Sequence, residues 1–337
     1  MKRFFIVCSL LVAGINCQKA LAQEPATVQH VQRGENFASQ GQLELAVREY
    51  EQALDAGAGS AQVLNRLAEF YLQTGASDKA VAVLQRSLQE KPGQLQVYSR
   101  LGEAFFSQGR PDSAIHYVEE ARRLAPQVSE VRSSLGFLYL QTGDRGRARE
   151  HLEAAVGLDP GNPEAHRYLG VYFIQTDSLD QALRQFRRLV ELLPDDVEAL
   201  NNVAFVLSRQ QHYRQAIEYY TRAKALAVDP RVSHAINLNI EAANAILAGK
   251  MRARYILVDT QAEAREVQQR LQQGADFAEL ASQYSKAANA ADGGDTGFFG
   301  PGELLPEFEG AVTRLRVGSV SESVEVPHGV LVIQRVN

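Results

Sequence analysis

The sequence predicts an all-α solenoid of six helix-turn-helix repeats with a capping helix, followed by a small α+β domain with an antiparallel sheet. Three observations carry this prediction. Alanine recurs every 34 residues through the first two thirds of the 337-residue chain. This phase ends near residue 230, where one further helical segment follows. From Ala253 the pattern changes to alternating strands, short helices and a glycine-rich run.

Residues 1–22 have the order of a secretory signal peptide. Two basic residues precede the apolar stretch 4–15, and the small-x-small sequence Ala20-Leu21-Ala22 ends the segment. The apolar stretch is shorter than the roughly 18 residues of a membrane span. We therefore expect an exported, most simply periplasmic protein with no integral membrane segment after cleavage.

A lipid anchor on Cys17 is the alternative, but Asn16 stands where lipoprotein processing prefers a small residue. Both cysteines, Cys8 and Cys17, lie in the signal segment. Cleavage after Ala22 would leave no thiol, which excludes disulfides and cysteine-ligated metals from the mature chain.

Charge and motifs exclude several function classes. The net charge is −5, and without the three lysines and arginines of the signal segment it is −8, from 32 basic and 40 acidic residues. Nucleic acid is therefore not an expected partner. The seven histidines form no metal-binding motif, and no nucleotide-binding motif is present. We expect neither a metal nor another cofactor.

The repeat blocks span residues 27–230. They are residues 27–60, 61–94, 95–128, 129–162, 163–196 and 197–230, and their alanines are Ala46, Ala80, Ala114, Ala148, Ala182 and Ala216. Each block is expected to form two amphipathic helices, with small residues such as Gly102 and Gly136 where the helices cross closely. Several columns agree in phase, and together they resemble the tetratricopeptide repeat.

Helix ends recur with the same period. Proline is expected to stop the second helix of four blocks, at Pro92, Pro126, Pro160 and Pro194. Glycine supplies the turn between the two helices in the first four blocks. Asp177 and Gln211 replace it in the last two, and we expect those turns to be less tight.

Residues 231–250 form the predicted capping helix and joint. Residues 231–249 keep helical spacing but leave the 34-residue phase, as expected of a helix that covers the last repeat. The joint Lys250–Arg254 contains no Gly, Pro or Ser. We expect the repeats and the last domain to be held in a fixed or weakly hinged relation.

The resemblance to tetratricopeptide repeats implies a concave groove lined by the first helix of each pair. The groove residues that it implies are Leu72, Phe106, Phe137, Leu140, Ile174 and Phe205. We expect a mixed apolar and neutral groove, suited to extended and partly apolar polypeptide. The alternative is that these side chains only pack between neighbouring helices.

Residues 251–337 are expected to form the α+β domain. Its predicted elements are a strand at 253–259, a helix at 261–275, a helix capped by Asp276, a short helix at 306–315 and two strands in 321–336 around a Pro-His-Gly turn. The glycine-rich run GGDTGFFGPGELLPEF occupies residues 293–308. With YILV at 255 and GADFAELASQYS, these motifs resemble the parvulin-type prolyl isomerase domain.

This second resemblance implies a site for an X-Pro peptide whose apolar pocket is built from Phe299, Leu304 and Phe308. Leu304 stands where the family usually has methionine, and the exchange conserves volume. The polar centre departs further, because Tyr255 and Leu331 replace two histidines and Ala287 replaces an acidic residue or cysteine. Tyr255 remains the candidate catalytic group, through its hydroxyl.

His328 lies three residues from the position of the second histidine, in the turn before the last strand. We expect it to face solvent and assign it no catalytic role.

Two functional hypotheses follow. In the first, the protein is an exported folding factor: the repeats bind unfolded or extended polypeptide clients, and the last domain binds, and in one version isomerises, their proline-containing segments. Isomerisation needs no nucleophile, metal or cofactor, because binding the twisted amide better than the planar one is sufficient. In the second, the protein is a non-catalytic assembly scaffold whose last domain only binds peptide.

Overall fold

The computed structural model describes residues 26–337. The expectations for the signal segment 1–22 and for Cys17 lie outside these residues. The chain divides into two compact units between Asp177 and Ser178, and each is described by itself.

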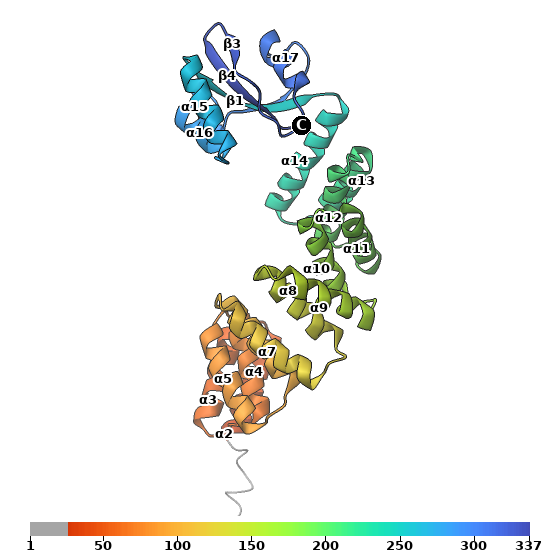
Figure 1. Ribbon diagram of the computed structural model, residues 1–337. Helices are drawn as coiled ribbons and strands as arrows, with labels where there is room; N and C mark the ends of the chain where they lie inside the picture. Colours follow the sequence, from red (N-terminus) through yellow and green to blue (C-terminus); the bar gives the residue numbers. More distant parts are fainter. Residues whose placement is uncertain (1–25) are drawn as a thin grey trace, which may run out of the picture. The chain divides into compact units, whose positions relative to one another are not determined.

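The first unit is a series of helices that pack pairwise along the chain (Figure 1). They are α2 (Ala26–Ser39), α3 (Leu43–Asp55), α4 (Ala61–Gln73), α5 (Ser77–Glu90), α6 (Leu95–Ser107), α7 (Pro111–Leu124), α8 (Ser129–Gln141), α9 (Arg145–Leu158) and α10 (Pro163–Gln175). The pairs follow the predicted repeat blocks, and the period of the alanines is a period of buried positions. The predicted solenoid is confirmed.

Close helix crossings explain the columns of small residues. A Cβ atom added at Gly102 would lie 2.3 Å from Cγ2 of Val118, and one at Gly136 would lie 2.4 Å from Cγ of Leu152. Both distances are far below van der Waals contact. The close approach of the first and second helices in these repeats therefore requires glycine at positions 102 and 136.

The second unit continues the helices and adds the α+β domain. Its helical part comprises α11 (Leu179–Leu192), α12 (Val197–Arg209), α13 (Tyr213–Leu226) and the predicted capping helix α14 (Pro230–Leu247). The domain contains β1 (Met251–Val258), α15 (Gln261–Gln272), α16 (Phe277–Tyr284), η1 (Ala290–Asp292), β2 (Asp295–Phe299), α17 (Pro306–Arg314), β3 (Val324–Val326) and β4 (Gly329–Arg335). As predicted, the side chain of Asp276 caps α16.

Helix ends follow the sequence signals, with one correction. The second helices α5, α7, α9 and α11 each stop two residues before the predicted proline. The expectation that Asp177 and Gln211 make looser turns is wrong. Asp177 has φ +54° and Gln211 φ +63°, the left-handed region that glycine occupies in the earlier turns. The backbone N–H groups of Gln211 and of the residue after it donate hydrogen bonds to the end of α12, as the corresponding groups do in the earlier glycine turns. Repeat packing therefore imposes this turn geometry without glycine.

The four-stranded sheet has the order β2-β1-β4-β3, and all its pairs are antiparallel. Alternate residues of β1 face opposite sides, with Ile256 and Val258 in one apolar cluster and Ala253 in the other. Helices α15 and α16 cover the first side and α17 covers the second (Figure 1). The second side is the one that carries the site.

Strand β2 was not predicted, because the glycine-rich run was interpreted as turn and pocket wall. Its pairing with β1 depends on the preceding glycine, since a Cβ at Gly294 would lie 2.3 Å from the carbonyl oxygen of Tyr255. The Arg252 guanidinium also donates hydrogen bonds to Asp295 across the two strands, with Nε 3.0 Å from Oδ1. The glycines thus let the run begin as an edge strand before it forms the loop to α17.

Candidate functional site

A pocket of about 240 Å³ lies on the α17 side of the sheet. It is lined by Tyr255, Leu257, Leu304, Leu305, Phe308, Val326, His328 and Leu331. These residues come from β1, the loop before α17, α17 itself and the β3–β4 hairpin. Six of the eight are leucine, valine or phenylalanine side chains, which offer only apolar contact. The pocket therefore suits an apolar group the size of a proline ring with its neighbour.

The loop that supplies Leu304 is fixed by a carboxylate. Glu309, on α17, accepts hydrogen bonds from the backbone N–H groups of Gly302 and Leu304, both at 2.9 Å from Oε1. These backbone donors lower the pKa of Glu309. Because the Glu309 carboxylate connects this loop to α17, the part of the pocket wall that Leu304 forms has a defined position.

Of the three residues that the sequence assigned to the pocket, Leu304 and Phe308 line it. Phe299 lies behind them: it is 3% exposed, and its ring centroid is 5.8 Å from that of Phe308. Phe308 in turn meets Tyr255 edge to face, with the centroids 5.6 Å apart. Phe299 therefore supports the pocket from the core, because β2 pairs with β1 and brings this side chain under α17.

Two polar side chains reach the pocket, Tyr255 and His328. Among residues 26–337, neither the Tyr255 hydroxyl nor the His328 ring hydrogen-bonds another protein group. His328 is exposed, as expected, but it also forms part of the rim. Leu331 lines the pocket where the resemblance implies a histidine, and Ala287 lies outside the lining. The pocket can supply apolar contact and hydrogen bonds from one phenol and one imidazole.

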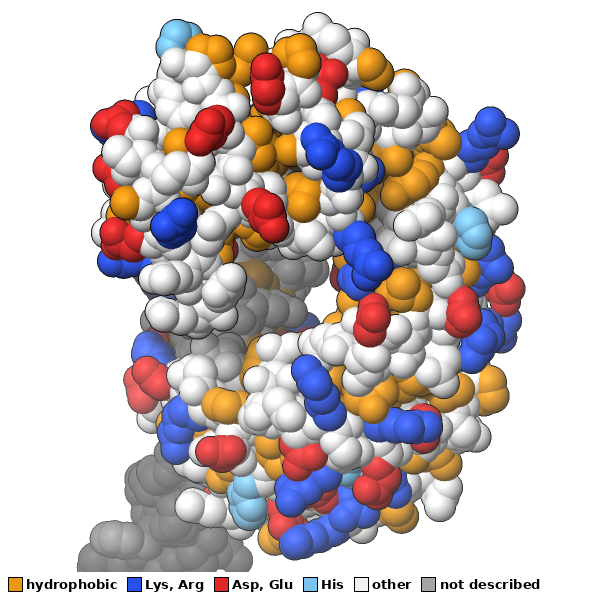
Figure 2. Space-filling model, turned by 45° about the horizontal axis from the view of Figure 1, so that its top comes forward, with side chains coloured by type: hydrophobic (Ala, Val, Ile, Leu, Met, Phe, Trp, Pro, Cys, Tyr) orange, Lys and Arg blue, Asp and Glu red, His pale blue; other side chains and the backbone are white. Residues whose placement is uncertain are grey.

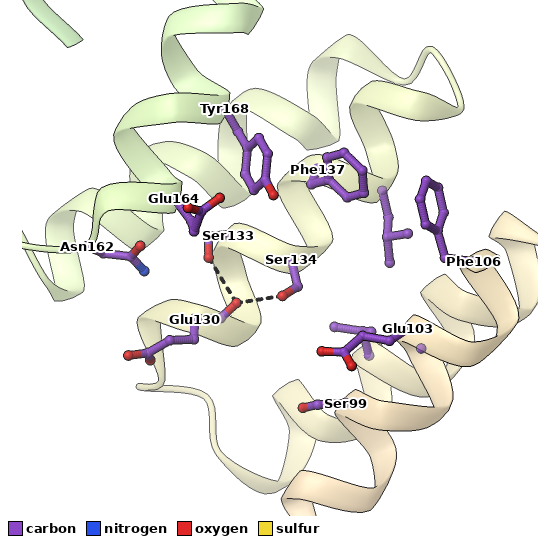
Figure 3. A pocket seen from close by; sticks show the side chains of 13 residues that line it. Ser99, Glu103, Phe106, Glu130, Ser133, Ser134, Phe137, Asn162, Glu164 and Tyr168 are labelled. Atoms are coloured by element: carbon purple, nitrogen blue, oxygen red, sulfur yellow. Dashed lines mark hydrogen bonds between the residues drawn. The ribbon is translucent and has the colours of Figure 1, made fainter. Parts of the chain in front are cut away.

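A second cavity, of about 280 Å³, lies within the repeats of the first unit (Figure 3). It is lined by Ser99, Gly102, Glu103, Phe106, Val118, Glu130, Ser133, Ser134, Phe137, Leu138, Asn162, Glu164 and Tyr168. Most of these belong to α6, α8 and α10, the first helices of three successive repeats. The predicted groove residues Phe106 and Phe137 are thus brought together here.

Aromatic rings form a row across these three helices. The centroids of Phe106 and Phe137 are 5.0 Å apart with the rings at 70°, and those of Phe137 and Tyr168 are 4.9 Å apart at 34°. All three side chains are only partly buried. The row therefore leaves ring surface available to a ligand in the cavity.

The cavity also contains three carboxylates, so the expectation of a neutral groove is wrong. Figure 3 shows Glu103 extending from α6 towards α8, while Glu130 and Glu164 lie in the first turns of α8 and α10. Glu130 and Glu164 are 34 residues apart, so the repeat period contained the signal that would have revealed them. Partial desolvation raises the pKa of Glu103, although its side chain remains exposed at the cavity.

The other predicted groove residues differ in exposure. Leu140 is 8% exposed and offers little surface. Leu72 and Ile174 are half-buried, and Leu72 packs against the core of the first repeats. Phe205, in the second unit, is 37% exposed. Leu140 and Leu72 thus follow the packing alternative more closely than Phe106 and Phe137 do.

Charged side chains of both signs are interspersed over the face drawn in Figure 2.

Within residues 26–337 no group of three His, Cys, Asp or Glu side chains could hold a metal ion. Over the same residues, no helix combines the length and hydropathy that a bilayer crossing requires.

Comparison with known proteins agrees with both resemblances. The PPIC-type PPIase (rotamase) family matches residues 255–337, and tetratricopeptide repeat families match residues 31–94, 99–163, 134–197 and 199–232. Foldase protein PrsA of Geobacillus sp. (strain WCH70) is 45% identical over 86 residues, which are 25% of this chain and 31% of the relative. Chaperone SurA of Cupriavidus metallidurans is 41% identical over 92 residues, 25% of this chain and 19% of the relative. The chain thus spans under a third of the length of these curated relatives.

Among solved structures, a tetratricopeptide repeat protein from Parabacteroides merdae is similar in fold, with a TM-score of 0.56 and 13% identity over 66% of this chain and 88% of that one. The protein therefore consists of tetratricopeptide repeats over residues 31–232 followed by a PPIC-type rotamase domain over residues 255–337.

Proposed function

We propose that this protein is an exported folding factor. The repeats bind extended client polypeptide, and the rotamase domain binds X-Pro segments of the client with little or no isomerase turnover. A folding role is supported by the similarity of the rotamase domain to proteins named foldase PrsA and chaperone SurA. Export, most simply to the periplasm, is supported by the order of basic, apolar and small residues in 1–22.

The proposal of low isomerase turnover rests on the composition of the rotamase pocket. Its wall of Leu304, Phe308 and Leu331 is suited to a proline ring, but Leu331 and Ala287 provide no polar group where the family has them. An X-Pro bond turns over alone in tens to hundreds of seconds, and a catalyst has to favour the twisted amide over both planar forms. Apolar contact acts on all three forms similarly, so it contributes affinity with little acceleration.

Catalytic isomerisation is the second candidate, and one observation favours it. Tyr255 lines the pocket, and its hydroxyl has no protein hydrogen-bond partner among the described residues. It is therefore available to donate to the carbonyl oxygen of a turning X-Pro bond. In that case Tyr255→Phe removes the acceleration and leaves affinity for the planar peptide nearly unchanged.

The test is refolding of a client whose slow phase is limited by one X-Pro bond, measured with the full chain. We expect suppressed aggregation of the unfolded client and an unchanged rate of the proline-limited phase. Acceleration that Leu304→Ala removes would establish the enzyme instead. Absence of any binding to the unfolded client would contradict the folding role and favour the scaffold.

A further inference from the structure

The repeat cavity combines aromatic surface with negative charge, and this combination indicates which client segments it takes. On the basis of the proposed client binding, we propose that the cavity between α6, α8 and α10 selects extended segments in which a lysine or arginine stands beside a large apolar residue. The cation would meet Glu103 or Glu130, which lie apart in the lining (Figure 3), and the apolar side chain would lie against Phe106 and Phe137.

The charge argument rests on carboxylates that have no cation of their own. Among residues 26–337, no hydrogen bond or ion pair to a protein group engages the carboxylate of Glu103 or of Glu130. Glu164 differs, because Arg167 Nε lies 3.4 Å from its Oε1. Two of the three carboxylates therefore leave the cavity negative, and a cationic ligand would balance them.

Arg100 is the basic group closest in sequence to Glu103, and its field lowers the pKa of that carboxyl, against the larger effect of burial. Its guanidinium is engaged elsewhere, 3.5 Å from Glu69 Oε2 and 3.2 Å from the carbonyl oxygen of Asn65. Arg100 therefore weakens the negative field at Glu103 without forming an ion pair with it.

The aromatic row adds a second preference for the same ligand. A guanidinium or ammonium group close to the face of Phe or Tyr is attracted by the ring quadrupole. Phe106, Phe137 and Tyr168 continue this surface from α6 to α10, beside the carboxylates (Figure 3). A neutral apolar side chain would use the rings alone, whereas a lysine or arginine with an apolar neighbour uses both parts of the cavity.

Burial of Glu103 gives the preference a pH dependence. Partial desolvation raises the pKa of Glu103 in the free protein, and a bound cation would lower it by favouring the ionised form. The free protein therefore holds the proton more tightly than the complex does. Binding of a basic segment should weaken as the pH falls through the pKa of Glu103, whereas binding of a neutral segment should not.

The test uses the full chain and three fluorescent, unstructured 12-residue peptides that share a central Leu-Phe pair and carry Lys, Gln or Glu on both sides of it. Fluorescence anisotropy gives the three dissociation constants at low salt. We expect the Lys peptide to bind about tenfold more tightly than the Glu peptide, with Gln between them, because both carboxylates attract the Lys peptide and repel the Glu peptide.

The variant Glu103→Gln plus Glu130→Gln keeps the shape of both side chains and should bring the three constants within about twofold of each other. The matched control, Glu44→Gln plus Glu90→Gln, removes the same charge from the second helices α3 and α5, outside the cavity lining. It should retain the order of the three peptides. Circular dichroism establishes that both variants fold.

Equal binding of the three peptides to the unchanged protein would overturn the inference and leave client binding intact. A preference for Lys that the cavity variant and the control reduce equally would overturn it too, since the general charge of the chain would then explain the effect. Failure of all three peptides and of an unfolded client to bind would contradict the proposed function itself.

Discussion

The repeat cavity and the rotamase pocket have similar volumes, about 280 and 240 Å³, but opposite chemistry. The repeat cavity keeps three carboxylates beside its aromatic row. The rotamase pocket has no carboxylate in its mostly apolar lining, and Leu331 stands where the resemblance implies a histidine. Under the proposed function, the difference means that a binding surface can persist without the polar groups that would give it turnover.

This contrast assigns separate tasks to the two sites. Charge discriminates between segments because an unbalanced carboxylate repels acidic ligands as strongly as it attracts basic ones. Apolar contact discriminates little beyond size. We therefore expect the repeats to decide which segment binds, and the rotamase pocket to add affinity where that client carries a proline.

The largest expected effect comes from breaking the aromatic row. Replacing Phe106 and Phe137 by serine should weaken binding of the neutral Leu-Phe peptide about 30-fold or more, as for aromatic hot spots. Leu124→Ser, on the exposed surface of α7, serves as the control. A circular dichroism spectrum that shows the fold lost would mean that the two rings are core residues, as in the packing alternative.

The rotamase pocket should give a smaller effect. Leu304 is 37% exposed, so Leu304→Ala removes pocket surface without opening the core. We expect about tenfold weaker binding of an Ala-Pro peptide, from the lost apolar contact. Titration calorimetry measures it, with Val317→Ala, 63% exposed and outside this pocket, as the control. Unchanged affinity would place the proline site elsewhere.

Much of the fold could be predicted from the sequence, because positions that are buried in every repeat carry small or apolar residues every 34 residues. Ala148 and Gly136 are two such positions. Strand β2 was missed because local glycine content conceals a strand whose pairing is long-range. Phe299 was misplaced for the same reason, since only the sheet puts it behind Phe308. Glu130 was missed although it recurs one repeat later as Glu164, because the period alone does not say that this position faces the cavity.

The stability of α9, which packs against α8, should depend on pH. His151 stacks on Tyr139, and burial lowers its pKa below the ordinary value of 6.5. The unfolded chain therefore takes up a proton first, and stability should fall as the pH drops below about 6.5. The protection of amides in α8 and α9, which is their hydrogen-exchange rate relative to that of an unfolded chain at the same pH, should be lower at pH 5.5 than at pH 7.5.

In His151→Gln this part of the pH response should disappear, whereas His116→Gln, which changes an exposed histidine of α7, should retain it. An identical response in both variants would assign the effect to other groups, such as Glu119, whose Oε1 lies 3.7 Å from His151 Nε2.

The smallest effect concerns the turns that lack glycine. Gln211→Gly should raise the free energy of unfolding by about 0.5 kcal/mol, because relief of the left-handed conformation exceeds the added entropy of the unfolded chain. Asp177→Gly should raise the free energy of unfolding by a smaller amount, since aspartate tolerates the left-handed conformation better than glutamine does. Urea unfolding measures both, and the reciprocal Gly143→Gln should lose about 1 kcal/mol. A loss of stability in Gln211→Gly would mean that its side chain has a structural role.

The central claim is that the rotamase pocket binds an X-Pro segment without turning it over. Exchange NMR on an Ala-Pro peptide tests this most directly, because it measures binding and the cis-trans rate in one sample of the full chain. We predict shifted peptide resonances that move back towards their free positions in Leu304→Ala, with an exchange rate within about twofold of the uncatalysed one. A rate raised tenfold or more, and lost in Tyr255→Phe, would contradict the account and identify a working isomerase.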